Sequence, residues 1–117
     1  RNNFAYRLAM HKEDLDIAES LALQASDAAP SHAQFLDTYG WVLFQKGDYD
    51  RALVQFKRAF LLNDTDKMTI EHLGDVHFKL GKVSEAIEYW NKAKELSSDN
   101  KSLDKKIADK KYYEPIY

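Results

Sequence analysis

The sequence predicts an all-α fold, an α-solenoid of about three helix–turn–helix hairpins followed by a C-terminal capping helix. The main observation is an internal repeat, because the shift that places Gly40 on Gly74 brings seven positions of restricted chemistry into register. The matched pairs are Gly40 and Gly74, Phe44 and Phe78, Gly47 and Gly81, Ala52 and Ala86, Phe56 and Trp90, Ala59 and Ala93, and Leu62 and Leu96. A period of about 34 residues is typical of two-helix units that bury their apolar faces only by stacking on one another.

A first repeat is expected over residues 1–31. Its first helix would contain Ala5, Leu8 and Ala9. Its second helix would contain Leu15, Ala18, Ala22, Ala25 and Pro30. Residues 11–14 stand where the later repeats have a glycine turn and are one residue longer, so this repeat departs most from the pattern.

The second repeat, over residues 32–65, opens with apolar residues at the spacing of one buried helical face. These residues are Phe35, Leu36, Tyr39, Gly40, Leu43 and Phe44. Ser31 and Gln34 predict a capping box at the start of this helix. Gly47 would end the helix and Asp48 would cap the next one. The buried line of that second helix would be Ala52, Phe56, Ala59 and Phe60.

The third repeat, over residues 66–99, copies this pattern. Its apolar positions are Ile70, Leu73, Gly74, His77 and Phe78, then Ala86, Trp90 and Ala93, with the turn at Gly81. A glycine inside a helix costs about 0.8–1 kcal/mol relative to alanine. Gly40 and Gly74 recur at the repeat period, which indicates that the paired helix approaches closely there.

The last segments are a capping helix over residues 100–111 and a tail over residues 112–117. Leu103, Ile107 and Ala108 would face the preceding repeat. The outer face would be lysine-rich, with Lys101, Lys105, Lys106, Lys110 and Lys111. Four of the six tail residues are large and apolar or amphipathic, so we expect Tyr112 and Tyr113 to pack within the same molecule and the chain to be a monomer.

These motifs resemble the tetratricopeptide (TPR) repeat family. Leu36-x2-Tyr39-Gly40-x2-Leu43 and Ile70-x2-Leu73-Gly74-x2-His77 are similar to its first-helix pattern, and Ala52-x3-Phe56 and Ala86-x3-Trp90 to its second-helix pattern. The resemblance covers nearly the whole chain and implies a single TPR domain over residues 1–117. The stretch from Phe35 to Phe44 also resembles the C-terminal repeats of longer bacterial TPR proteins.

The resemblance implies a function, a concave groove lined by the first helices that binds a peptide. The positions carried over to this groove are Tyr6, Met10, Gln34, Asp37, Thr38, Trp41, Gln45, Met68, Glu71, His72, Asp75, Lys79, Lys105 and Lys106. We therefore expect a non-enzymatic protein-interaction module, part of a larger scaffold or adaptor. The alternative is a spacer or capping segment of a longer solenoid, with an unused groove.

Trp41 separates these two interpretations. It follows Gly40 and lies off the buried stripe, so we expect it to be partly exposed, as a binding hot spot would be. In a spacer, it would instead be buried against the adjacent first helix.

Some TPR grooves hold the acidic C-terminus of heat-shock chaperones with lysine, arginine and asparagine side chains. The matching positions here are Asn2, Tyr6, Thr38, Met68 and His72, so most of this clamp is absent. With Asp37, Glu71 and Asp75 nearby, we expect the groove to disfavour such peptides.

Composition gives no sign of other functions. The net charge of −2 provides no general attraction to nucleic acid, and the lysine-rich last helix carries Asp104 and Asp109 and lacks arginine. There is no cysteine, no phosphate-binding glycine loop and no apolar run near the ~20 residues that span a bilayer. His72 and Asp75 share a helical face without a third ligand set by spacing. We expect no cofactor, metal or catalytic site. The start at Arg1 suggests a cut within a longer protein, which leaves the compartment open.

Overall fold

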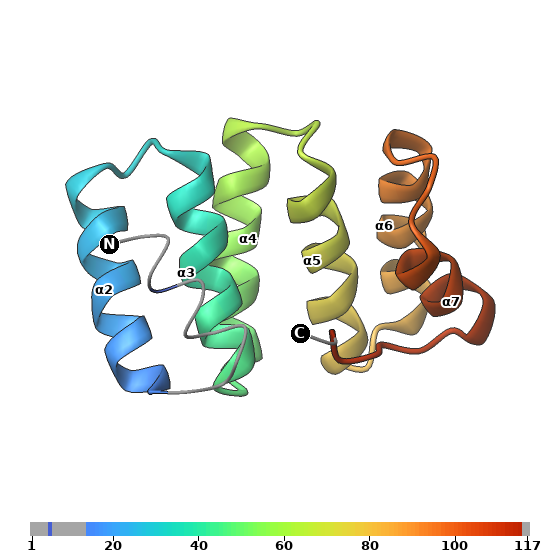
Figure 1. The fold of residues 1–117 in the computed structure, drawn as a ribbon, viewed down its shortest axis with the longest axis horizontal. Coiled ribbons are helices and arrows are strands. Elements are labelled where there is room, and N and C mark those ends of the chain that lie inside the picture. Colours follow the sequence, from blue (N-terminus) through green and yellow to red (C-terminus); the bar gives the residue numbers. More distant parts are fainter. Residues whose placement is uncertain (1–4, 6–13, 116–117) are drawn as a thin grey trace.

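Antiparallel helix pairs stack side by side in chain order in the computed structural model, which describes residue 5 and residues 14–115 (Figure 1). The helices are α2 (Leu15–Ala28), α3 (Ala33–Gln45), α4 (Tyr49–Leu62), α5 (Lys67–Lys79), α6 (Val83–Leu96) and α7 (Lys101–Asp109). They follow one another across Figure 1 from blue to red. The predicted all-α helical-repeat solenoid is confirmed.

The repeat period appears directly in the helix boundaries. Helix α5 begins and ends one full period after α3, and α6 begins and ends one full period after α4. Gly47 and Gly81 lie between the paired helices with φ of 83° and 82°, which an L side chain rarely adopts. Of the predicted turn at residues 11–14, only Asp14 is described, and it takes the same left-handed conformation (φ 47°) ahead of α2.

Gly40 and Gly74 mark the closest approaches within the two central helix pairs. Phe56 of α4 and Trp90 of α6 are fully buried against them. A methyl group added to Gly40 would lie 2.7 Å from Phe56 Cε1, and one added to Gly74 would lie 2.3 Å from Trp90 Cδ1. Both distances are shorter than van der Waals contact, so the predicted reason for these glycines is confirmed.

Of the two predicted helix-start features, one is present and the other is not. The carboxylate of Asp48 accepts the backbone N–H of Arg51 at 3.3 Å, as predicted, and Asp66 caps α5 in the same way. The predicted capping box of Ser31 and Gln34 is wrong. Helix α3 begins at Ala33, so His32 holds the cap position, and Gln34 is one residue too early to reach back to it.

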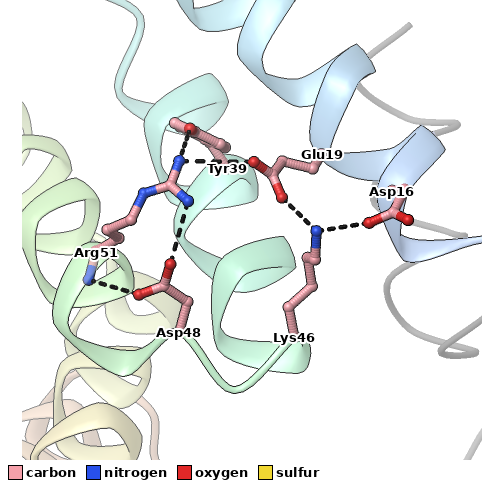
Figure 2. Close-up of polar contacts among 6 residues, drawn as sticks. All are labelled: Asp16, Glu19, Tyr39, Lys46, Asp48 and Arg51. Carbon is pink, nitrogen blue, oxygen red and sulfur yellow. Dashed lines mark hydrogen bonds and ion pairs between the residues drawn. The ribbon is translucent and has the colours of Figure 1, made fainter.

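Helix α2 is attached to the next hairpin by a cluster of charged side chains (Figure 2). Lys46 Nζ lies 2.7 Å from Asp16 Oδ1 and 2.6 Å from Glu19 Oε1, and these hydrogen bonds raise the pKa of Lys46 to about 12. Arg51 donates to the Tyr39 hydroxyl at 2.9 Å and pairs with Glu19 at 3.5 Å. Glu19 thus pairs with both cations and adds a polar link between α2 and the second repeat.

Helix α7 is shorter than the predicted 100–111. The Asn100 side chain accepts the backbone N–H of Leu103 at 3.0 Å and so caps its start. The helix ends at Asp109, and the next residue, Lys110, adopts a left-handed conformation with φ of 55°. Lys106 is not on the outer, solvated face as predicted, because it is buried against α5. After Lys110 the chain reverses and runs back toward the lower end of α5 in Figure 1.

We expect Lys110→Gly to stabilise the protein, because glycine adopts the left-handed conformation without the clash that a Cβ atom creates. The expected gain in the free energy of unfolding is about 1 kcal/mol. Urea denaturation of the two proteins measures it. A loss of stability in the variant would show that the lysine side chain matters more than the backbone strain.

Candidate functional site

Helices α3, α5 and α7 are the first helices of successive units, and they form a surface that we call the first-helix face. The described part of the predicted groove falls on these helices, whereas Tyr6 and Met10 lie outside the described residues. Exposed positions are Gln34, Met68, Lys79 and Lys105, and half-buried ones are Gln45 and Glu71. Buried positions are Asp37, Thr38, Trp41, His72, Asp75 and Lys106. Half of the predicted groove residues with described positions are therefore inaccessible.

Trp41 is the clearest correction. It was expected to be partly exposed, but only 2% of its surface is accessible. Its ring stacks on His72 of α5, with centroids 4.5 Å apart, and on Phe44 at 5.3 Å. The apolar stripe of a single helix predicts contacts within a hairpin. Trp41 lies off that stripe and instead packs between the successive first helices α3 and α5. It is a packing residue between repeats.

Charged side chains from α5 and α7 form a buried network on this face. Lys106 Nζ lies 2.9 Å from Asp75 Oδ1 and 2.7 Å from Glu71 Oε2. Asp75 also accepts a hydrogen bond from Trp90 Nε1 at 3.0 Å. Burial raises the pKa of Asp75. Burial alone would lower the pKa of Lys106, but the charges of Asp75 and Glu71 outweigh it and raise that pKa. Helix α7 is thereby held on α5 by a nearly water-free ion pair.

A second buried pair links α3 to α5. His72 Nδ1 donates to Asp37 Oδ1 at 3.1 Å. The imidazole also packs against the ring of Phe56, with ring centroids 5.1 Å apart. Burial lowers the pKa of His72, but the charge and hydrogen bond of Asp37 outweigh it, with help from Asp75 and Glu71, and raise it above the ordinary value. His77 of α5 is packed as predicted, and its Nδ1 donates to the Leu73 carbonyl at 2.7 Å.

The raised pKa of His72 predicts how stability depends on pH. Its contribution is complete below the unfolded-state value of 6.5 and is lost as pH rises through the higher folded-state pKa. The parent should therefore lose stability relative to His72→Gln as pH increases above 6.5. Urea unfolding of both proteins from pH 5 to 9 measures this, and parallel stability curves would contradict it.

The described part of the C-terminal tail, residues 112–115, reaches the first-helix face. Tyr112 is buried, and its ring meets the ring of Phe44 edge-on, with centroids 5.3 Å apart. The ammonium groups of Lys79 and Lys106 each lie 5.1 Å from the Tyr112 ring centroid. Tyr113 donates to Asp109 at 2.6 Å and lies under Lys105. The predicted intramolecular packing of these tyrosines is confirmed, but sequence reasoning missed Phe44 as the contact of Tyr112.

A small cleft opens where the three last helices meet. It has a volume of about 110 Å³ and is lined mainly by apolar atoms. Its walls are Lys67, Met68, Glu71, Ala93, Ser97, Asn100 and Leu103. Met68 and Glu71 were predicted groove residues, so this part of the first-helix face remains accessible.

The described residues contain neither a metal-binding cluster nor a membrane-spanning helix. None of their histidine, aspartate or glutamate side chains gather in groups of three or more that could hold a metal ion. None of their helices combines the length and the apolar character needed to cross a bilayer.

Comparison with solved structures places the fold among TPR domains. The chain superposes on the first TPR of Spaghetti (RPAP3) bound to an HSP90 peptide, with a TM-score of 0.85 and 17% identity, covering 93% of this chain and 86% of that one. The first TPR domain of human RPAP3 gives the same score and identity, covering 93% and 85%. A mutant O-GlcNAc transferase of Thermobaculum terrenum gives 0.79 at 20% identity, with 94% of this chain matching 22% of that enzyme.

Sequence comparison gives the family. No curated protein matches the sequence. The family model described as anaphase-promoting complex, cyclosome, subunit 3 matches residues 9–103, which is most of the chain. The chain therefore belongs to this family of TPR-like helical-repeat proteins.

Proposed function

We propose that the chain is a non-enzymatic protein-interaction module that binds a peptide segment on its first-helix face, within a larger scaffold or adaptor. The observation that carries this proposal is the position of Tyr112 in the chain's own tail, whose buried side chain contacts residues of α3, α5 and α7. The accessible cleft beside Met68 adds a second contact point on the same face.

A spacer or capping role is the second candidate, and the burial of Trp41 favours it. With Asp37, Thr38, His72 and Asp75 also buried, the centre of the first-helix face serves packing between helices. In that case the tail and α7 would only close the end of a solenoid.

Matched glutamate substitutions distinguish the two candidates. Met68 on α5 and Val54 on α4 are both half-exposed, at 49% and 53%. If the first-helix face binds a partner, Met68→Glu in the parent protein should remove partners that Val54→Glu retains. Crosslinking followed by quantitative mass spectrometry measures this. Equal recovery with both variants would support the spacer.

The proposed ligand class excludes acidic chaperone C-termini. Thr38 and His72 occupy two of the clamp positions and are buried, and the negative charges of Asp37, Glu71 and Asp75 act on His72. We expect no measurable heat when an HSP90 C-terminal peptide is titrated into the chain at physiological salt. Micromolar binding in that experiment would contradict the prediction.

A further inference from the structure

Residues 110–115 leave the last helix and return across the first-helix face. Lys110, with φ of 55°, reverses the chain, and Figure 1 shows the segment running from α7 back toward α5. Within this segment Tyr112 is buried, Tyr113 and Pro115 are half-buried, and Lys111 and Glu114 are exposed. Tyr112 is thus the buried side chain among the described residues of this segment.

The surroundings of Tyr112 match an aromatic side chain specifically. The ring of Phe44 on α3 meets the Tyr112 ring at an interplanar angle of 71°, the edge-to-face geometry that aromatic quadrupoles favour. Lys79 of α5 and Lys106 of α7 place their ammonium groups within cation–π distance. An aliphatic side chain at this place would lose both kinds of contact.

Phe44, Lys79 and Lys106 come from three different helices. Phe44 is fixed by stacking on Trp41, and Lys106 by its ion pairs with Glu71 and Asp75. Neither of these supports involves the tail. The receiving surface is therefore built by the repeats themselves and would keep its shape when Tyr112 leaves.

We propose that this surface is a binding site for an aromatic residue of a partner segment and that Tyr112 occupies it in cis as a tethered competitor. The inference rests on the proposed function and specifies its ligand: an extended segment that presents tyrosine or phenylalanine. A short tether gives Tyr112 an effective concentration in the millimolar range. A partner must displace Tyr112. The apparent affinity of the partner is therefore its intrinsic affinity multiplied by the fraction of time that the site is open.

A peptide with the sequence of residues 111–117, KYYEPIY, is the probe. Fluorescence anisotropy should show that the labelled peptide binds full-length Tyr112→Ala at least ~10-fold more tightly than the parent, as expected for a tail that occupies the site more than about nine-tenths of the time. Equal affinity for the two proteins would overturn the proposal. So would equal binding of a peptide in which the first tyrosine is alanine.

Tyr113→Ala is the matched control. The hydrogen bond of Tyr113 to Asp109 and its cation–π pair with Lys105 are both made to α7. This variant should bind the peptide as weakly as the parent. If Tyr112→Ala fails to fold by circular dichroism, titration of the unaltered chain decides. Saturable NMR shifts at Phe44 and Lys79 are then expected at millimolar peptide, the concentration at which the peptide competes with the tethered tail, and their absence would overturn the proposal.

The two hypotheses can fail separately. Loss of partners with Met68→Glu but no peptide binding to Tyr112→Ala would reject the tethered competitor and keep the interaction module. Peptide binding with no partner lost by Met68→Glu would leave the aromatic site standing and reject the wider binding face.

Discussion

Replacing Lys106 with methionine should destabilise the protein by about 3–5 kcal/mol, the range for removing one partner of a buried ion pair. The Lys106 and Asp75 side chains are only 4% and 2% exposed, so the substitution leaves Asp75 charged in a nearly water-free site. Protonation of Asp75, whose pKa burial already raises, limits the loss at low pH. Thermal and urea unfolding at pH 7 measure the effect.

Lys105→Met is the matched control, because Lys105 is the exposed neighbour on the same helix. It removes the same charge and should change stability little. Adding Asp75→Asn to Lys106→Met should recover part of the loss, since the amide oxygen still accepts the N–H of Trp90. If Lys106→Met and Lys105→Met unfold at the same temperature, the ion pair does not hold α7 on α5.

Gly74→Leu and even Gly74→Ala should destabilise the protein by about 1–3 kcal/mol through overpacking. A Cβ atom at Gly74 would lie 2.3 Å from Trp90 Cδ1 and 3.1 Å from the Ala86 carbonyl oxygen. The buried indole cannot move without weakening its hydrogen bond to Asp75, and the carbonyl belongs to the backbone of α6. The melting temperature of each variant checks this.

A double-mutant cycle with Trp90→Leu tests the cause. Removing the indole should reduce the penalty of Gly74→Ala, so the combined loss should be smaller than the sum of the single losses. Additive losses would place the cost elsewhere, for example in helix propensity. A melting temperature for Gly74→Ala equal to that of the parent would contradict close packing altogether.

The fold could be predicted because its signals are local and repeated. The stripe that includes Leu36 and Leu43 requires a helix, and the same pattern one repeat period later requires a second, equivalent one. Gly47 and Gly81 are needed for a backbone conformation, and Gly40 and Gly74 for space. Each of these requirements concerns contacts within a single hairpin. The sequence of that hairpin is therefore enough to predict it.

Which side chains of the first-helix face are buried could not be predicted in the same way. Trp41 is buried by α5, and Lys106 by carboxylates 31 and 35 residues earlier in the chain, so neither contact shows in the pattern of its own helix. Lys106 has lysine neighbours at 105, 110 and 111 and no local feature that distinguishes it. The path of the tail depends on the left-handed Lys110, where no glycine signals a reversal.

Nuclear Overhauser effects between aromatic rings in the free, full-length chain show whether Tyr112 lies on the first-helix face in solution. With ring centroids 5.3 Å apart, Tyr112 and Phe44 should give strong cross-peaks that Tyr112→Ala removes. The cross-peaks should persist on dilution, as expected for packing within one molecule. Tyr112 resonances at random-coil positions, with no cross-peak to Phe44, would show that the tail leaves this face open.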